Sequence, residues 1–563
     1  MRLRELEIKN FGCIGSKGLR IVIDEIIVLI GPNNVGKSTV LKAYQTFESG
    51  NKSTLREEDF YEYDCSTPIE IIGTFCDISE EDKIQIGEKW IFDNIDYGDC
   101  ISYKYVWDKP NVKGSKFSYN HNDDDWEAGG MGGWDTKIAS CIPSSLCVNP
   151  LDDPGALEGA IIEILANAVK QNAQTEESKI KNLIDDLNKI AEDIQEEIKE
   201  DIESTTNEIE KNIENVFPSV KVSLKSQAGN FQVEKVIASG SHLRISDESG
   251  KEYPLGNQGS GLQRAFLWSA IQALAENGRL KKGRTQLKSE KPKILLVEEP
   301  ESFLHPPAIR NAREALYNIA QLAGWQVMIT THSPIFIDVS KPHTTIIRIE
   351  KSDKGETKSF STNKASFDEN DRDRLKMIRN CNPEVNEFFF SNKIILVEGE
   401  TEQSIFNELK SNPEIHIVNC YGKANIPTFQ KILNHFSVEY IVLHDTDFPQ
   451  VKRNEKKITN SMWTMNKKIF EESNKNENNL VIASVPDLEQ CFFGKLQKGD
   501  KPYQALKKIQ DTDFIKSNEF KVLEEIANFN IAELKESEYV IKKIEDYQTK
   551  FDNYDATSDL GEE

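Results

Sequence analysis

The sequence predicts an α/β protein in which two domains with parallel strands follow each other along the 563-residue chain. Three observations support this fold class. An apolar run enters a glycine-rich turn and then a helix within residues 26–44. Residues 157–216 contain almost no Gly or Pro and carry apolar residues at helical spacing. After residue 390, apolar strands alternate with helical segments, and the strands end in acidic residues.

The composition is that of a soluble protein, with 38% hydrophobic and 29% charged residues. No uninterrupted apolar run reaches the roughly 18 residues of a membrane-spanning helix. The N-terminal MRLRELEIKNF lacks the apolar core of a signal peptide. The nine cysteines are scattered without a CxxC pair. We therefore expect reduced thiols, neither a zinc site nor a disulfide frame, and a cytoplasmic location without a membrane partner.

The formal net charge of −24 argues against broad, nonspecific adhesion to nucleic acid. The acidic excess is uneven, because acids outnumber bases most strongly in residues 176–214 and in the tail 552–563. The remainder is only mildly acidic, so a local basic groove stays possible.

The segment GPNNVGKS, residues 31–38, matches the phosphate-binding pattern G-x-x-x-x-G-K-S between a predicted strand and a predicted helix. Backbone N–H groups at the helix start surround phosphates, Lys37 brings a positive charge to the β and γ phosphates, and Ser38 offers its hydroxyl to Mg²⁺. Asn34 stands where many such loops carry glycine, and asparagine tolerates a left-handed backbone. The predicted ATP-binding residues of this loop are Gly31, Asn34, Gly36, Lys37, Ser38 and Thr39.

Two later strands supply acids and a histidine for ATP hydrolysis. The buried strand 294–297 leads to Glu298, which would steady Mg²⁺ through water, and to Glu299, which would polarise the attacking water. The apolar strand that begins at residue 326 leads to His332, a predicted sensor of the γ-phosphate.

The run GSGLQ, residues 259–263, leads into a helix. Its Ser260, Gly261 and Gln263 are predicted to hold a γ-phosphate at the helix N-terminus, and a plain glycine-rich helix cap is the alternative.

Taken together, these motifs resemble the ABC-type ATPases of DNA repair, of the RecF and SMC kind. The resemblance implies an ATPase head with a mixed sheet around the P-loop, in two lobes at 1–155 and 217–385. It also implies that Ser260 acts in trans on the nucleotide of a second head, so at least a homodimer is expected. Glu298 departs from the commoner aspartate, and slow hydrolysis is therefore expected.

Between the two lobes, residues 156–216 are predicted to form a helical insertion. Because its polar face is heavily charged, we interpret it as a protrusion that pairs with a second subunit. A helix packed on its own domain is the alternative.

Acidic residues follow three apolar strands of the C-terminal part. They are Glu398 in IILVEGETEQSIF, Asp445 and Asp447 in EYIVLHDTDFP, and Glu489 beyond NLVIASV. Parallel strands present their C-terminal ends at one edge of a sheet, so we expect Glu398, Asp445 and Asp447 to converge there. Such acids repel one another unless a cation holds them, and hard oxygen ligands suit Mg²⁺ or Mn²⁺. A solvated first helical turn explains only Glu400.

These residues resemble a Toprim domain, here placed at 390–510. The order of an ABC-like ATPase and a Toprim domain is similar to the OLD (overcoming lysogenization defect) family, to which the Gabija nuclease subunit is related. The resemblance implies a metal-dependent DNA endonuclease, often in anti-phage defence. Its implied site residues are Glu398, Glu402, Asp445 and Asp447 for one metal ion, Glu489 for a second, and Lys501 for the scissile phosphate.

Two lysines have alternative interpretations. Lys501 is as well explained as a surface lysine, and Lys423 in YGKAN is a second candidate for a phosphate contact. His444, which precedes the acids, is interpreted as structural. Residues 511–563 are predicted to be helical with an acidic tail, and no chemistry is assigned to them.

The predicted function is thus a DNA endonuclease with ATP and Mg²⁺ at the ATPase site and two Mg²⁺ or Mn²⁺ ions at the Toprim site. The ATPase dimer is expected to gate the Toprim site. Partners would be DNA, a second copy of the chain and a neighbouring defence protein. The alternative is a DNA-clamping RecF/SMC-like repair ATPase with a non-cutting Toprim domain. A topoisomerase would need a further DNA-cutting domain with a tyrosine nucleophile, and a primase would usually carry zinc-binding cysteines. The sign of ATP control, and dimer versus tetramer, stay open.

Overall fold

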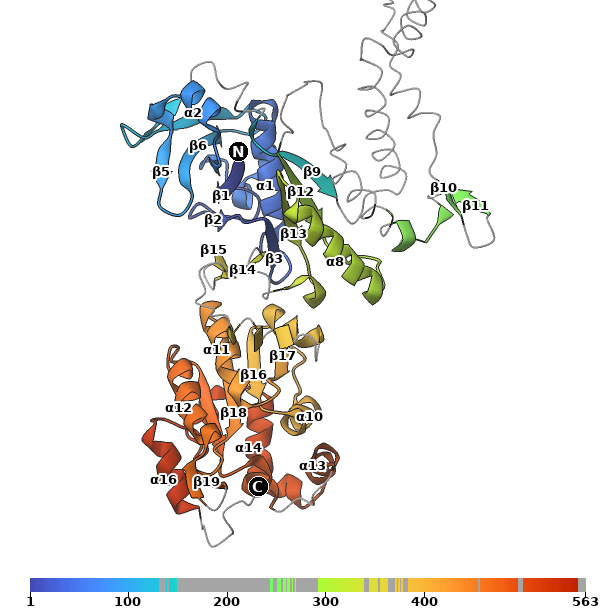
Figure 1. Ribbon diagram of the computed structural model, residues 1–563, viewed down its shortest axis with the longest axis vertical. Coiled ribbons are helices and arrows are strands. Elements are labelled where there is room, and N and C mark those ends of the chain that lie inside the picture. The colour runs from blue at the N-terminus through green and yellow to red at the C-terminus, as the bar shows by residue number, and fades with distance from the viewer. Residues whose placement is uncertain are drawn as a thin grey trace, which may run out of the picture. The chain divides into compact units, whose positions relative to one another are not determined.

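The computed structural model of the chain describes residues 1–130, 138, 141–148, 244–246, 251–254, 257–259, 261–263, 266, 269, 292–338, 344–352, 355–362, 370–371, 373–374, 376–377, 383–453, 456–494 and 500–554. The chain divides into two compact units. The first unit comprises Met1–Val148, Lys291–Ser302 and Ala323–Glu563, and the second comprises Asn149–Glu290 and Phe303–Leu322. Figure 1 shows the elements of the chain, of which many are labelled.

The first unit begins with an antiparallel N-terminal sheet of order β2-β1-β4-β6-β7-β8, in which β5 also pairs with β6. Buried and half-exposed positions alternate along β1 and the first half of β4, as expected for strands with one face on a core. The strands are β1 (Arg2–Lys9), β2 (Leu19–Val22), β4 (Ile69–Cys76), β5 (Phe92–Asn94), β6 (Gly98–Trp107), β7 (Ser115–Asn120) and β8 (Asp125–Ala128).

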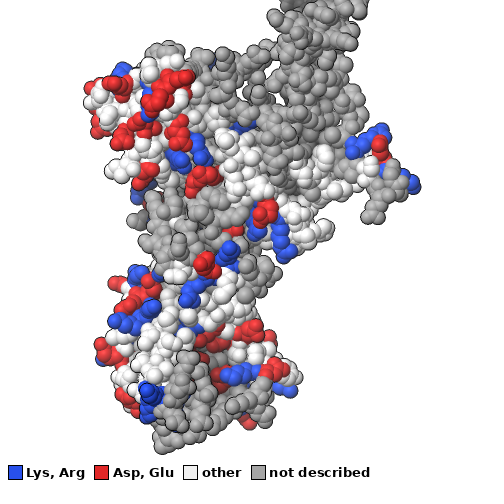
Figure 2. Space-filling model, in the orientation of Figure 1, with Lys and Arg blue, Asp and Glu red and all other residues white. Residues whose placement is uncertain are grey.

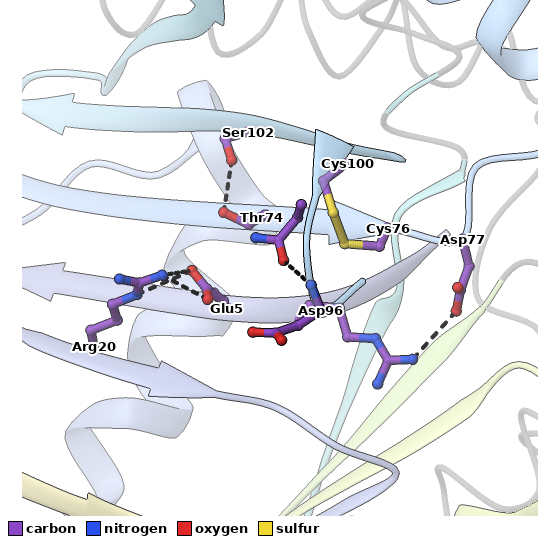
Figure 3. Close-up of a disulfide and its surroundings, with 10 residues drawn as sticks. Glu5, Arg20, Thr74, Cys76, Asp77, Asp96, Cys100 and Ser102 are labelled. Carbon is purple, nitrogen blue, oxygen red and sulfur yellow. Dashed lines mark hydrogen bonds and ion pairs between the residues drawn. A yellow bond between two sulfur atoms is a disulfide. The ribbon is translucent and has the colours of Figure 1, made fainter. Parts of the chain in front are cut away.

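A disulfide joins Cys76 of β4 to Cys100 of β6 (Figure 3). The antiparallel register puts these residues directly opposite each other, with their Cα atoms 4.3 Å apart. The expectation of reduced thiols throughout is therefore wrong for this pair. The two cysteines are 24 residues apart in sequence, and only the strand register brings them together.

The central sheet has the order β15-β14-β3-β13-β12-β9. All neighbours in it are parallel except β15, which is antiparallel to β14. The residues of β3 and β13 are buried throughout, as is typical of parallel strands covered on both faces. The strands are β3 (Ile26–Ile30), β9 (Ser144–Val148), β12 (Lys293–Glu298), β13 (Trp325–Thr330), β14 (Thr344–Lys351) and β15 (Thr357–Ser361).

Helix α1 (Lys37–Ser49) follows β3 directly and contributes to a core that also contains residues of the N-terminal and central sheets. Val40, Tyr44 and Phe47 lie in this core, four or three residues apart on one face of the helix. The predicted mixed sheet with a phosphate-loop core is confirmed.

The C-terminal sheet is parallel and has the order β17-β16-β18-β21. Successive residues of β16 face two different cores, because Ile394 and Leu396 belong to one and Ile395 and Val397 to the other. The strands are β16 (Lys393–Val397), β17 (Ile415–Asn419), β18 (Glu439–Asp445) and β21 (Leu480–Ser484).

Helices cover both faces of this sheet. Residues of α11 (Ile426–His435) and α12 (Ser461–Ser473) contribute to one core, and residues of α10 (Glu400–Leu409), α13 (Lys501–Ile509) and α14 (Asn518–Ala527) to the other. The chain continues through α15 (Ile531–Leu534) to α16 (Glu545–Asn553), so the expected helical C-terminal segment is present. An antiparallel hairpin, β19 (Gln450–Arg453) and β20 (Lys456–Thr459), lies between β18 and α12 in the chain.

The second unit contains the two-stranded sheet of β10 (Arg244–Ser246) and β11 (Glu252–Pro254) and the helix α8 (Pro306–Gln321). The predicted helical insertion at 156–216 lies outside the described residues, and so does Ser260. Among the residues that are described, no helix is both long and apolar enough to span a membrane.

Candidate functional site

The phosphate-binding loop connects β3 to α1, and its backbone depends on residues that accept positive φ. Gly31 has φ 135°, and a Cβ atom there would stand 2.1 Å from the carbonyl oxygen of Ile349. Gly36 has φ 117° and Asn34 has φ 61°, the left-handed conformation that its residue type favours. Lys37 Nζ donates to the carbonyl oxygens of Gly31 (2.9 Å) and Pro32 (2.7 Å).

The strands next to this loop bring an acid and a histidine to the same edge of the central sheet. Glu299 follows β12, and its backbone N–H donates to Thr330 O at the end of β13 (2.9 Å). Burial lowers the pKa of Lys37, and the charge of Glu299 opposes that change. Partial burial, followed by the charge of Lys37, lowers the pKa of His332. Lys37, Glu299 and His332 are therefore close enough to influence one another electrostatically.

Glu301 is a member of this group that the sequence analysis missed. Its carboxylate accepts hydrogen bonds from the hydroxyl of Thr331 (2.8 Å) and the backbone N–H of His332 (2.7 Å). Burial raises its pKa, and these hydrogen bonds oppose the rise. Glu301 thus ties the loop after β12 to the His332 loop. It was visible as the third acid of the motif EEPES, of which only the first two acids were assigned.

The remaining predicted nucleotide contacts are distributed over both units. Ser38 is exposed near the start of α1, whereas the hydroxyl of Thr39 lies 3.2 Å from the sulfur of Cys13. Glu298 is the last residue of β12. Gly261 and Gln263 belong to the second unit, where the backbone N–H of Gln263 donates to Gly259 O (3.2 Å) in a turn that opens a helix.

The second group of predicted residues lies at the C-terminal edge of the C-terminal sheet. From β16 the chain passes to β17 on one side and then to β18 on the other, so β16 and β18 flank the point where the strand order reverses. Ligand sites of open parallel sheets lie at such points. Glu398 directly follows β16, Asp445 ends β18, and Glu398 Oε1 accepts from the backbone N–H of Asp445 (2.8 Å).

We call the edge where β16 and β18 end the acidic edge. Burial and the repulsion between neighbouring carboxylates raise the pKa values of its acids. Burial raises the pKa of Glu398 to about 7, against the opposing charge of Lys423. Burial also raises the pKa of Glu402, in the first turn of α10, and the charge of Glu489 adds to it. Burial raises the pKa of Asp445 well above its ordinary value, and the charges of Glu398, Glu402, Asp487 and Glu489 add to the rise. These acids are therefore close enough to compete for one positive charge.

Lys423 is buried next to the 445–447 segment, with 3% of its surface exposed. Its ammonium group donates to the carbonyl oxygens of Asp445 (2.5 Å) and Thr446 (3.3 Å) and to the carboxylate of Asp447 (2.6 Å). A lysine has three N–H donors, and all three are satisfied here. The interpretation of Lys423 as a phosphate contact is therefore not supported, and its geometry is that of a residue that positions the 445–447 segment.

A second polar contact reaches the same segment from the C-terminal helix. His444 Nδ1 lies 2.8 Å from the carbonyl oxygen of Asp445, and His444 Nε2 lies 2.9 Å from the hydroxyl of Tyr547. A carbonyl oxygen only accepts, so Nδ1 carries the proton and Nε2 accepts from Tyr547. Burial lowers the pKa of His444 to about 3, so the ring is neutral. No local signal marks Tyr547, which is 103 residues away from its partner.

Lys501 and Glu489 face each other at the margin of the acidic edge. Lys501 begins α13, and its Nζ lies 2.7 Å from Glu489 Oε1. The lysine side chain is 55% exposed and thus remains accessible to a ligand. Asp487 is engaged by the backbone N–H and the side-chain amide of Gln490, both at 2.8 Å. Glu400 is exposed on the first turn of α10.

The expected convergence of the carboxylates is met only in part. Within the described ranges, no three His, Cys, Asp or Glu side chains are arranged so that they could hold a metal ion. Glu398 accepts from a backbone N–H group and Asp447 from Lys423, because like charges in a buried site turn toward the nearest donors. The donor set nevertheless fits a hard divalent cation, since buried carboxylates that repel one another are the ligands that Mg²⁺ and Mn²⁺ prefer.

A short helical segment connects the His332 loop to the acidic edge. It comprises residues Pro383–Phe390 and leads directly into β16. Asn386 donates to the carbonyl oxygens of Pro334 (3.3 Å) and Ile337 (2.9 Å), in the segment just after His332. The ring of Phe390 lies 6.4 Å from the imidazole of His332, measured between centroids.

Arg348 of β14 fixes the end of this segment. Its guanidinium group is fully buried and donates to the carbonyl oxygens of Phe389 (3.2 Å) and Ser391 (3.1 Å) and to the side chain of Asn392. The central sheet is thereby attached to the beginning of β16.

Comparison with known families identifies both parts of the chain. The family described as "AAA ATPase domain" matches residues 1–140 and 154–337, which is more than half of the sequence. The chain belongs to the AAA ATPase domain family. Residues 389–447 match a second family, described as "Overcoming lysogenization defect protein-like, TOPRIM domain". The expected resemblance to the OLD family is confirmed, as is the expectation of an enzyme that joins an ATPase domain to a Toprim nuclease domain.

Two relatives match most of this chain, and a third matches less than half of it. The "Old nuclease" of Escherichia phage P2 is 25% identical over 553 residues, which cover 92% of this chain and 87% of the relative. The "OLD nuclease" of Thermus scotoductus is 23% identical over 539 residues, 91% of this chain and 95% of the relative. The "Endonuclease GajA" of Bacillus cereus is 25% identical over 314 residues, 43% of this chain and 44% of the relative.

Solved structures similar to the chain include SMC head domains. One is an SMC head bound to the C-terminal winged-helix domain of ScpA, with a TM-score of 0.35 and 14% identity, and it covers 64% of this chain and 97% of that one. Another is the SMC head domain from Thermotoga maritima, with a TM-score of 0.31 and 13% identity, at 64% and 98% coverage.

Proposed function

We propose that this AAA ATPase is a nucleotide-controlled, divalent-metal-dependent DNA endonuclease of the OLD type. The observation that carries the proposal is the group of acids at the edge where β16 and β18 end. Burial raises the pKa of Glu398, Glu402 and Asp445, and the charges of Glu398, Glu402 and Glu489 all add to the rise at Asp445. A protein that only binds DNA gains nothing from buried acids that repel each other and the DNA. The relatives named as nucleases match over nearly the whole chain, which supports the same conclusion.

Each residue of the acidic edge has a role in phosphodiester cleavage. Glu398, Glu402, Asp445 and Asp447 would hold one divalent ion and Glu489 a second, and such ions supply an activated water and neutralise the leaving oxygen. Lys423 keeps the 445–447 segment in place. The exposed Lys501 brings a positive charge to the margin of the site, where a scissile phosphate would lie.

ATP would be bound and hydrolysed at the edge of the central sheet. The P-loop with Lys37 and Ser38 would hold the phosphates and Mg²⁺ together with Glu298, Glu299 would polarise the attacking water, and His332 would contact the γ-phosphate. Ser260, Gly261 and Gln263 would act on the nucleotide of a second copy, which requires a homodimer or a larger homo-oligomer.

The proposed control of cleavage by ATP has a physical route. A γ-phosphate that moves the His332 loop also moves the carbonyl oxygens of Pro334 and Ile337, to which Asn386 is bonded. The segment that carries Asn386 continues into β16, and Glu398 follows β16 directly. The nucleotide state would thereby change the position of a metal-binding carboxylate.

The biological role that fits this activity is anti-phage defence, together with a protein encoded nearby. A DNA-clamping ATPase with a non-cutting Toprim domain is the second candidate. The attachment of β16 to the nucleotide edge supports the clamp and the nuclease equally, because either activity could respond to ATP in this way. The two candidates differ in whether DNA is cut.

The test is incubation of supercoiled and linear DNA with Mg²⁺ or Mn²⁺, with and without ATP, for the wild type and Lys37→Ala. We expect metal-dependent cleavage by the wild type. The Lys37→Ala variant, which loses the charge that holds ATP, should show a changed response to ATP and thereby reveal the sign of the control. Intact ATP hydrolysis without cleavage under any condition would favour the clamp.

A further inference from the structure

The hairpin of β19 and β20 is an unusually basic element in an acidic protein. The chain carries a net charge of −24, and Figure 2 shows acidic side chains gathered over α2 (Glu80–Ile86) and β5 of the N-terminal sheet. By contrast, the described residues of the hairpin, 450–453 and 456–459, contain Lys452, Arg453, Lys456 and Lys457, and the one acid in the sequence from 450 to 459 is Glu455, between the two strands. We call these eight residues the basic ribbon.

The register of the basic ribbon places like charges opposite each other. Lys452 pairs with Lys457, and Arg453 pairs with Lys456. Like charges directly across an antiparallel pair destabilise it. Lys452, Lys456 and Lys457 are exposed, and the ion pairs found among the described residues of the Toprim region include none of them. The repulsion is thus not relieved within the described part of the chain, and a polyanion would relieve it.

The base of the ribbon is held next to the acidic edge. Gln450 is three residues after Asp447, so their Cα atoms are at most about 11 Å apart. The backbone N–H of Asn460 donates to Pro449 O (3.0 Å) and closes the hairpin. The ring of Phe551 in α16 contacts Phe448, which precedes the ribbon in sequence, and Trp463, which follows it, at centroid distances of 5.7 and 5.6 Å.

From these observations we infer that the basic ribbon holds the phosphate backbone of double-stranded DNA beside the cleavage site. Phosphates follow one another at about 3.4 Å per strand, so a ribbon within about 20 Å of Asp447 reaches phosphates several nucleotides from the scissile bond. Lysines that contact phosphates give binding without reading sequence. This inference rests on the proposed nuclease function and names the surface by which that site receives its substrate.

The experiment compares DNA binding by the full chain with that of two matched triple variants. The first replaces Lys452, Lys456 and Lys457 with alanine. The control replaces Lys467, Lys468 and Lys475, which are exposed lysines of α12 and the turn after it, and changes the net charge equally. Affinity for a fluorescein-labelled DNA duplex is measured by anisotropy in EDTA, so that no cleavage occurs, over a series of salt concentrations.

We expect the ribbon variant to bind roughly tenfold or more weakly, and the slope of log affinity against log salt to fall by about 2 to 3. The control variant should keep an affinity and a slope close to those of the wild type. A third variant with arginine at the three ribbon positions should restore binding, which separates lost charge from a damaged hairpin.

Equal binding by the ribbon variant and the wild type would overturn the inference, and so would an equal loss in the control. A loss seen with duplex RNA but not with duplex DNA would overturn the assignment of DNA. Cleavage assays of the same proteins separate the two proposals. If the wild type and the ribbon variant cut DNA equally, the inference about the basic ribbon is wrong and the proposed nuclease function is supported. If DNA binding depends on the ribbon but neither Mg²⁺ nor Mn²⁺ supports cleavage, the proposed nuclease function is wrong and the inference about the basic ribbon is supported.

Discussion

At the acidic edge, the direction of each carboxylate depends on a few buried neighbours. Lys423 donates all three of its N–H groups to the 445–447 segment. Tyr547 donates to the ring of His444, and that ring donates to the carbonyl oxygen of Asp445. Neither residue has to touch DNA or a metal ion to matter. Both determine where Asp445 and Asp447 lie.

Replacement of Lys423 by methionine should keep the packing volume and remove the positive charge and all three hydrogen bonds. Because the partners of metal ligands typically contribute 10–100-fold to metal affinity or activity, we expect a loss of about that size in Mn²⁺ affinity and in DNA cleavage. Mn²⁺ binding is measured by electron paramagnetic resonance. Lys431→Met is the control, because it removes a lysine that pairs with Asp371. Wild-type Mn²⁺ affinity in Lys423→Met would contradict the positioning role.

Replacement of Tyr547 by phenylalanine should leave Nε2 of the buried His444 without a donor. An unsatisfied buried acceptor costs about 1–3 kcal/mol, so the free energy of unfolding in urea should fall by about that amount. Tyr503→Phe is the matched control, because Tyr503 is 54% exposed, and it should change stability by no more than about 0.5 kcal/mol. Equal stability of the two variants would show that the hydrogen bond to His444 is absent in solution.

Among the elements, the loops after β12 and β13 act together at the nucleotide edge. Glu301 belongs to the first loop and accepts from two donors at the start of the second. The loop that carries His332 is also bonded to Asn386 through Pro334 and Ile337. The position of His332 therefore depends on Glu301 on one side and on the segment before β16 on the other.

Replacement of Glu301 by alanine should release the His332 loop without removing a residue predicted to contact ATP. Misplacement of a catalytic group by about 1 Å costs up to roughly 100-fold, so we expect ATP hydrolysis to fall by about 10–100-fold. Phosphate release is measured at saturating ATP. Glu58→Ala, which removes an exposed partner of Arg56, serves as the control. A hydrolysis rate in Glu301→Ala equal to that of the control would contradict this role.

The order of the elements could be predicted from the sequence because each strand is an apolar run that ends in turn or acidic residues. The strands before Gly31, Glu299, His332, Glu398 and Asp445 all occur where the apolar runs predict them. The parallel edges that collect these residues follow from the alternation of strands and helices. Local sequence therefore carries this part of the fold and of the candidate site.

Contacts across long sequence separations could not be predicted in the same way. The disulfide between Cys76 and Cys100 depends on the register of two strands, and the contact of Tyr547 with His444 depends on where a distant helix packs. Lys423 in YGKAN was a candidate for a phosphate contact, but the carbonyl oxygens of the 445–447 segment bind its ammonium group at a buried site.

For the whole molecule, the central claim is that one chain joins two sites. ATP acts at the edge of the central sheet, and DNA is cut with a divalent metal ion at the acidic edge. The contacts of Asn386 and Arg348 attach the central sheet to β16, so the two edges belong to one connected structure within the first unit. A loss of the acids at the end of β18 should abolish cutting and leave the P-loop intact.

The most direct test is DNA cleavage by the double variant Asp445→Ala and Asp447→Ala beside the wild type, in Mg²⁺ and in Mn²⁺, with ATP hydrolysis measured on the same preparations. Our account predicts cleavage by the wild type, none by the double variant, and ATP hydrolysis by both. Cleavage by the double variant at the wild-type rate would contradict it, because the cutting would then arise at another site.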